Sequence, residues 1–202
     1  MRSTLALEVG DAESLARVGA DVAVAGFFRD QRPLRGGAGV ADWRLCGFLS
    51  RLLVAARAQG EIGEAVLTTT HGRFRAPRLL LVGLGARQRF GADAHRAAVE
   101  HAVERVLDLG AGSAAVDLPP PIGDAPLDDV ATGIVEGACA ALDPRTARFL
   151  LRVVAAGGSA GRFRTALDHA AVAHPRGATS VRLVRPPTPG GPGASNGAHP
   201  RV

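Results

Sequence analysis

The distribution of apolar residues along the chain predicts alternating strands and helices. Residues 21–28 (DVAVAGFF) and 78–82 (RLLLV) are almost continuously apolar, which is typical of strands covered on both faces. Longer stretches with apolar residues three and four positions apart predict amphipathic helices. We expect strands at 4–9, 21–28, 64–70, 78–82, 113–118, 149–156 and 180–184, and helices at 40–60, 92–109, 126–142 and 161–173. This alternation predicts an α/β fold, a three-layer sandwich with a mixed β-sheet.

The stretch at residues 32–53, RPLRGGAGVADWRLCGFLSRLL, predicts a loop that turns into a long helix. Pro33 ends the preceding extended segment, and three glycines provide the freedom for a sharp change of direction. The apolar residues that follow, among them Trp43 and Phe48, recur on one side of a helix. We therefore expect this helix to bury its tryptophan and to be a main contributor to the core.

Length and composition predict one domain followed by a tail. With 202 residues and 47% hydrophobic content, the chain is long enough for one good core, which we place in residues 1–185. Residues 186–202 are rich in proline and glycine and are expected to be disordered. Cys46 and Cys139 lie in helical patterns, as expected of buried, reduced thiols in a cytoplasmic protein. No apolar run approaches the ~20 residues that cross a bilayer, so no membrane partner is expected.

The basic residues are unusual in kind and in place. All 24 are arginines, which excludes lysine chemistry such as Schiff bases. Residues 1–143 carry 15 arginines against 18 acidic residues, whereas residues 144–202 carry nine arginines against Asp168 alone. A basic final third is compatible with a polyanionic partner such as a nucleic acid, but a solvated arginine-rich surface explains it more simply.

The sequence GGSAG at residues 157–161 matches the G-x-S-x-G pattern of a hydrolase nucleophile. Asp168 and either His169 or His174 follow Ser159 in the order that such a triad requires. However, Asp168 and His169 are neighbours on one predicted helix, where successive side chains diverge by about 100°, so they cannot align behind one serine. The pattern is better interpreted as a glycine-rich turn between a strand and a helix.

Other candidate sites depend on glycines, histidines or cysteines. Gly83 and Gly85 follow a strand, but Gln88 occupies the third glycine position of a dinucleotide-binding turn, so a tight turn is expected. Free N–H groups at a helix start, flanked by two arginines, form a weak candidate anion site: Arg32, Arg35, Gly36, Gly37 and Gly39. The six histidines and two cysteines show no metal-ligand spacing. We therefore assign no catalytic, metal-binding or cofactor-binding residue.

Several short motifs resemble one known family. They are Arg32 to Gly36, Asp42-Trp43, Leu49 to Leu52, Leu79 to Gly85 and Gly133 to Gly137. Together they are similar to the N-terminal domain of the leucyl (cytosol) aminopeptidases, the M17 metallopeptidases, over about residues 20–185. The resemblance implies a macro-domain-like fold and, in the family, a separate catalytic domain that binds two metal ions.

The metal-binding signature of that family, N-T-D-A-E-G-R-L, does not occur in this sequence. We therefore expect a non-catalytic relative that acts by protein binding or assembly, with an aminopeptidase catalytic domain or a second copy of itself as partner. Two alternatives remain open. One is an accessory component of a split metallo-aminopeptidase, and the other is nucleic-acid or nucleotide binding through the basic final third.

Overall fold

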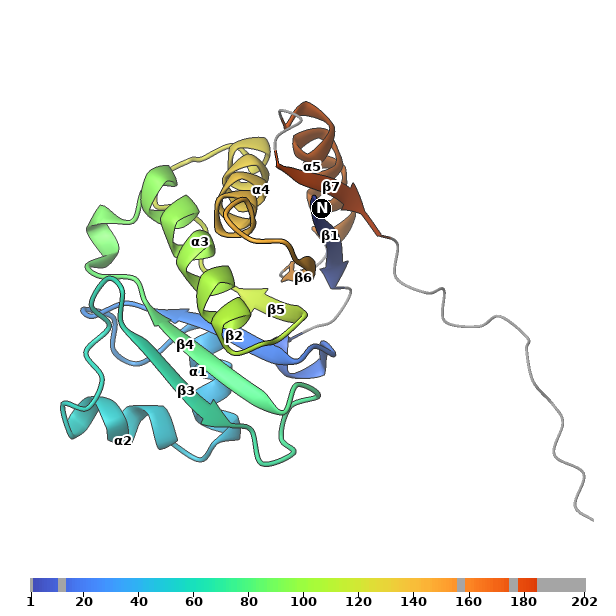
Figure 1. Ribbon diagram of the computed structural model, residues 1–202. Helices are drawn as coiled ribbons and strands as arrows, with labels where there is room; N and C mark the ends of the chain where they lie inside the picture. The colour runs from blue at the N-terminus through green and yellow to red at the C-terminus, as the bar shows by residue number, and fades with distance from the viewer. Residues whose placement is uncertain (1, 11–13, 156–158, 175–177, 185–202) are drawn as a thin grey trace, which may run out of the picture.

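The sheet is the organising element of the structure (Figure 1). The computed structural model describes residues 2–10, 14–155, 159–174 and 178–184. Seven strands lie in the order β3-β4-β2-β5-β6-β1-β7. Their bounds are β1 Ser3–Gly10, β2 Val22–Phe27, β3 Ala65–Thr69, β4 Arg78–Gly83, β5 Ser113–Asp117, β6 Arg148–Val154 and β7 Thr179–Leu183. Strand β3 runs antiparallel to β4 and the other pairings are parallel, so the sheet is mixed.

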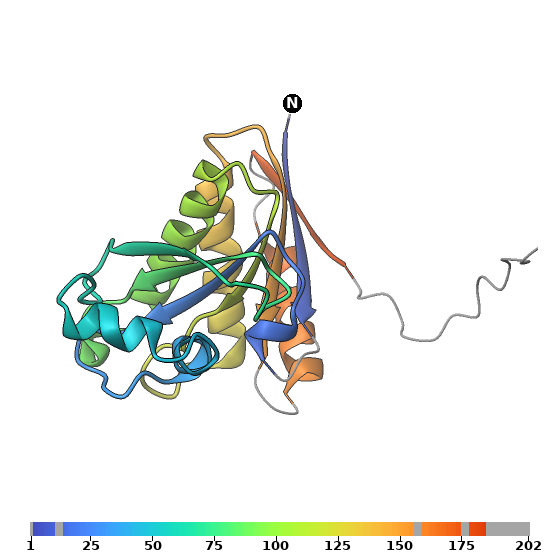
Figure 2. The ribbon, with the colours of Figure 1, turned by 90° about the horizontal axis from the view of Figure 1, so that it is seen from below.

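Helices cover both faces of this sheet. Their bounds are α1 Gly36–Arg44, α2 Phe48–Val54, α3 Ala92–Asp108, α4 Leu127–Leu142 and α5 Ala160–Ala173, with short 3-10 turns η1 Leu15–Arg17 and η2 Arg87–Arg89. Helices α3, α4 and α5 pack side by side on one face, and α1 and α2 lie on the other (Figure 2). The predicted α/β sandwich with a mixed sheet is therefore confirmed.

The larger core lies between the sheet and the helices α3, α4 and α5. It contains inward-facing residues of β1, β2, β4, β5 and β6, such as Leu7, Val24 and Leu151, all fully buried. Helices α3 and α4 approach closely at Gly137, where an added Cβ would lie 2.5 Å from the carbonyl oxygen of Arg96. A side chain at this position would force the two helices apart.

The smaller core lies on the opposite face and reaches only part of the sheet. Its fully or partly buried sheet residues come from β2, β3, β4 and β5 and from the last residue of β6, Val154, and they pack against α1, α2 and η1. Within the described residues, β1 and β7 contribute nothing to this core. In the described part of the chain, therefore, no helix lies over the face of β1 and β7 that is turned away from α5 (Figure 2).

The predicted helix at 40–60 is wrong in detail, because the chain forms two short helices there. Helix α1 starts earlier, at Gly36, and ends at Arg44. The break falls at Cys46 and Gly47, whose φ angles are 54° and 75°. Both values lie in the left-handed region, which stops an α-helix, and glycine reaches it without strain.

The predicted burial of Trp43 and Cys46 is also wrong. Trp43 is 78% exposed, because at 100° per residue it projects from the side of α1 opposite to the buried Ala38 and Ala41. Cys46 is exposed and accepts a hydrogen bond from Arg73 at 3.2 Å, whereas Cys139 is buried as expected. Burial raises the pKa of the Cys139 thiol to about 12.

Two further predictions concern the chain outside the core. The tail at 186–202 lies outside the described residues, and so do Gly157 and Gly158 of the GGSAG motif. None of the helices in the described part of the chain has the length and apolar character needed to span a membrane.

Trp43 and Leu49 should respond to truncation in opposite ways. Because Trp43 is exposed, Trp43→Ala should change the free energy of unfolding by no more than about 0.5 kcal/mol. Leu49 is 3% exposed, so Leu49→Ala should cost about 2–5 kcal/mol. Urea unfolding of both variants measures the difference, and a large loss in Trp43→Ala would contradict the placement of this side chain at the surface.

Candidate functional site

The five residues of the candidate anion site do lie together, at the start of α1. Arg35 is the N-cap residue, and Gly36 follows it with φ 55°. Arg32 is turned back onto its own loop, because its guanidinium donates to the carbonyl oxygens of Phe28 and Gln31, each at 2.8 Å. Gly39 fits closely under the carbonyl of Leu34, which a Cβ would approach to 2.7 Å.

A carboxylate of the chain itself lies beside this helix start. Asp117, the last residue of β5, lies so close to Gly37 that a Cβ there would be 2.8 Å from its Oδ2. Burial raises the pKa of the Asp117 carboxyl above its ordinary value. An anion bound at Gly37 would meet this carboxylate, and anion binding there stays a prediction.

The carboxyl ends of β2 and β5 form the topological switch point of the sheet, because the chain leaves these neighbouring strands in opposite directions. Such crevices often bind ligands, and here two leucines pack against Gly26 of β2. A Cβ at Gly26 would lie 2.7 Å from Leu84 Cδ1 and 2.8 Å from Leu118 Cδ2. In the turn after β4, the backbone groups of Gly85 already have partners within the chain. The Gly85 amide donates to the Gly60 carbonyl, and the Gly85 carbonyl accepts from the Arg29 amide.

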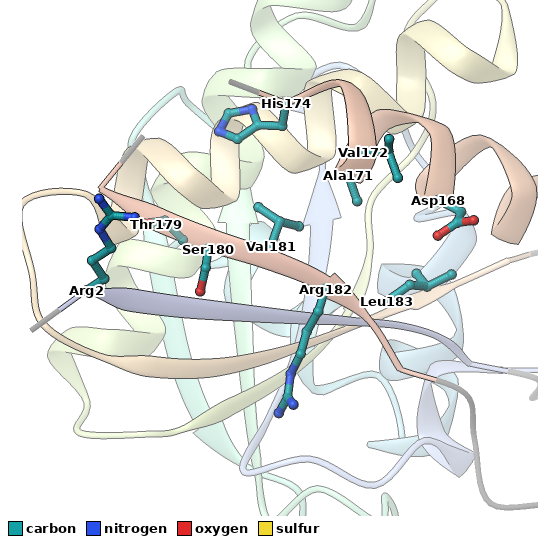
Figure 3. A pocket seen from close by; sticks show the side chains of 10 residues that line it. All are labelled: Arg2, Asp168, Ala171, Val172, His174, Thr179, Ser180, Val181, Arg182 and Leu183. Atoms are coloured by element: carbon teal, nitrogen blue, oxygen red, sulfur yellow. The ribbon is translucent and has the colours of Figure 1, made fainter. Parts of the chain in front are cut away.

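The candidate hydrolase residues lie far apart along one helix. Ser159 is the N-cap of α5, Asp168 lies nine residues further on and His174 follows the C-terminus. At 1.5 Å per residue, Ser159 and Asp168 are separated by roughly 13 Å. Asp168 and His174 instead line a groove of about 500 Å³ between α5 and β7, shown in Figure 3.

Metal-ligating side chains are scattered in the described part of the chain. There, no three histidine, cysteine, aspartate or glutamate residues group in a way that could hold an ion. His95 is 2% exposed and packs edge-on against Phe90, with ring centroids 5.9 Å apart. Burial lowers the pKa of His95 to about 4, so it is a neutral packing residue at physiological pH.

The surface that sequence reasoning missed is the face of the sheet without a helix. We call it the open face; its hollow, of about 560 Å³, is lined by Thr4, Ala6, Gly112, Arg148, Phe149, Leu150, Arg182 and Val184. The alternation of buried and more exposed residues in β6 and β7 could have indicated a half-solvated sheet. Which helices cover which strands, however, depends on the strand order.

Arginines line both sides of this hollow. Arg148 lies opposite Thr4 on one side of β1, and Arg182 lies opposite Ala6 on the other side. Both are exposed, and within the described residues neither makes an ion pair. Arg152, further along β6, differs: its Nε is 3.0 Å from Glu8 Oε2, and Nη1 donates to the Gly19 carbonyl.

The sequence matches the model of one protein family over most of its length. The model of the N-terminal domain of the cytosol aminopeptidase family matches residues 22–171, most of the sequence. The chain belongs to this family. The match covers strands β2 to β6 and nearly all of α5, and it ends before β7.

Solved structures confirm the fold of this aminopeptidase-type domain. A macrodomain from Oceanobacillus iheyensis, solved as a point mutant, has a TM-score of 0.60 at 14% identity, covering 81% of this chain and 90% of that one. The macrodomain of Mycobacterium tuberculosis DarG has a TM-score of 0.53 at 18% identity, covering 72% of this chain and 97% of the other. At these identities the likeness concerns the fold alone.

A third similar structure is much longer than this chain. Tomato leucine aminopeptidase, also solved as a point mutant, has a TM-score of 0.52 at 19% identity, covering 85% of this chain but 36% of the enzyme. The aminopeptidase-type domain thus spans about a third of that protein. Among curated proteins, a sequence search finds no match.

Replacing Asp117 tests the cost of its carboxylate. The folded-state pKa is raised, so the folded chain takes up a proton before the unfolded chain does as the pH falls. The charged form therefore costs stability at pH 7, and this cost disappears below about pH 4. Asp117→Asn should raise the free energy of unfolding at pH 7, and the gain should shrink towards pH 4.

Urea unfolding at both pH values measures this effect. Asp124→Asn, at an exposed position, is the matched control and should have little effect. A loss of stability in Asp117→Asn at pH 7 would mean that the helix N-terminus holds the carboxylate favourably after all.

Proposed function

We propose that this chain is a non-catalytic binding domain that docks a separate protein on its open face. The observation that carries the proposal is the hollow over β6, β1 and β7, which has an apolar and hydroxyl-bearing floor and two arginines beside it. A sheet in this fold normally has helices on both faces, so the open face is where a further layer would fit.

The arginines indicate what kind of partner surface fits. Arg148 and Arg182 extend from strands on opposite sides of β1, level with Thr4 and Ala6, which are two residues apart along β1. Neighbouring strands are about 4.8 Å apart, so both guanidinium groups can reach one ligand that lies over β1. Charge-assisted bonds to carboxylates favour an acidic partner segment.

An aminopeptidase-type catalytic chain is the partner we propose. The family match and the tomato enzyme, of which this chain covers about a third, support this choice. The scattered metal-ligating residues and the separated Ser159 and Asp168 support a non-catalytic role for the chain itself. If the captured catalytic chain gains aminopeptidase activity when it is combined with this domain, the two form a split aminopeptidase. A neighbouring reading frame that begins near the metal-binding region of the family would favour a split enzyme.

Two measurements test the proposal. The purified chain should hydrolyse leucine p-nitroanilide no faster than a blank when manganese or zinc is present. As bait in a native extract, it should recover a chain of the aminopeptidase family, identified by mass spectrometry. Arg148→Glu with Arg182→Glu should abolish this recovery. The matched pair Arg57→Glu and Arg87→Glu, exposed on the far half of the domain, should preserve it.

Hydrolysis well above the blank would contradict the non-catalytic role. Recovery that is equal for both double variants, or the absence of any aminopeptidase-type chain, would contradict docking on the open face.

Nucleic-acid binding is a second candidate function, favoured by the same two arginines within the basic final third. Affinity that depends on phosphate contacts falls steeply with salt. A gel shift that appears at low ionic strength, disappears with added salt and is lost in the Arg148 and Arg182 double variant would support it. The absence of any shift at low ionic strength would exclude it.

A further inference from the structure

Strand β7 is the last strand of the sheet, and within the described residues its outer backbone N–H and C=O groups have no hydrogen-bond partner. The Val184 amide donates to the Leu7 carbonyl at 2.7 Å, so the backbone groups of Arg182 and Ser180 also point towards β1. Because these directions alternate, the N–H and C=O groups of Thr179, Val181 and Leu183 point away from the sheet. Among the described residues no strand lies beyond β7. An edge of this kind is a template for strand addition.

The groove between β7 and α5 runs along this edge (Figure 3). Its floor is apolar, with Ala171 and Val172 from α5 and Val181 and Leu183 from β7. Val172 is 82% exposed, which is unusual for a β-branched apolar residue on a helix that otherwise packs on the core.

The two ends of the groove carry opposite charges. Asp168 lies at the Leu183 end, whereas Arg2 and His174 lie at the Thr179 end (Figure 3). Within the described residues none of these three side chains makes an ion pair. A two-fold rotation therefore places the acidic end of one groove against the basic end of an identical groove in a second copy.

We propose that the occupant of this edge is a second copy of the chain, joined through antiparallel pairing of β7 with its counterpart. A two-fold axis at Val181 pairs Val181 with its own copy and Thr179 with Leu183 of the other copy. All of these residues have outward-facing backbone groups, so each pair exchanges both N–H···O bonds. The interface is self-complementary, as a two-fold axis requires.

The side chains agree with this arrangement. Asp168 of each copy faces Arg2 and His174 of the other, and the two exposed Val172 side chains meet across the axis above a continuous sheet. The inference is independent of the proposed function, because it uses the edge of β7 and the α5 groove rather than the open face.

Sedimentation velocity of the full chain over a range of concentrations tests the dimer. The wild-type chain should reach about twice its 20.7 kDa. Val172→Glu should weaken the dimer by roughly tenfold or more, because it places like charges on the axis. Val54→Glu, at an 89% exposed site on α2, is the matched control and should leave the dimer unchanged.

Charge-swapped variants distinguish the loss of this dimer interface from the loss of folding. Asp168→Arg makes both ends of the groove basic, and Arg2→Asp with His174→Asp makes both ends acidic, so each variant alone should be monomeric. Mixing the two should restore a heterodimer within roughly threefold of the wild-type affinity, because every facing pair is then opposite in charge. The Val181 and Leu183 amides should exchange hydrogen more slowly in the dimer.

A wild-type chain that stays monomeric up to several hundred micromolar would overturn the proposal. So would a dimer that Val172→Glu leaves intact, a mixture of the swapped variants that stays monomeric, or a dimer in which these two amides exchange as fast as in the monomer. An equal effect of Val54→Glu would place the contact elsewhere.

Discussion

One of the two helical layers is narrower than the sheet that it covers, and the other features of the structure depend on this difference. The connection from β2 to β3 supplies only α1 and α2, which, with η1, cover β3, β4, β2 and part of β5. Within the described residues, the remaining strands, β6, β1 and β7, are covered by helices on one face, apart from Val154 at the end of β6. Parallel strands normally bury both faces, so this half of the sheet departs from the usual arrangement.

The chemistry of the domain follows from that difference. At the switch point, where α/β sheets commonly bind ligands, Leu84 and Leu118 pack against Gly26, and Asp117 packs against Gly37. On the open half, apolar side chains and Thr4 line the hollow, and Arg148 and Arg182 have no ion-pair partner in the described structure. We therefore propose the open face and the edge of β7 as the surfaces for interaction.

Much of the fold could be predicted because its signals are local. The continuous apolar run of β2 and the proline before α4 each define an element, and the strands are right to within one or two residues at nearly every end. The helix at 40–60 was wrong because the apolar spacing continues through Gly47. There the left-handed backbone at two positions breaks the helix. Trp43 lies on the side of the shorter helix α1 opposite to Ala38 and Ala41 and is therefore exposed. Gly47 is the residue that could have indicated the break, but the regular apolar spacing around it predicted a continuous helix.

The candidate surfaces could not be predicted in the same way, because they depend on strand order. The neighbours of β1 are β6 and β7, residues 148–154 and 179–183, and nothing in the local pattern specifies this. Arg148 and Arg182 are therefore 34 positions apart in the sequence yet beside one hollow. Likewise, Asp117 meets Gly37 only because β5 lies next to β2.

Residue-resolved arginine labelling of the isolated chain with phenylglyoxal tests most directly whether half of the sheet is open. Arg148 and Arg182 should react about as fast as the exposed Arg57, whereas Arg152, held by Glu8 and the Gly19 carbonyl, should react several-fold more slowly. Protection of both Arg148 and Arg182 in the monomer would mean that this face is covered, and would contradict the account.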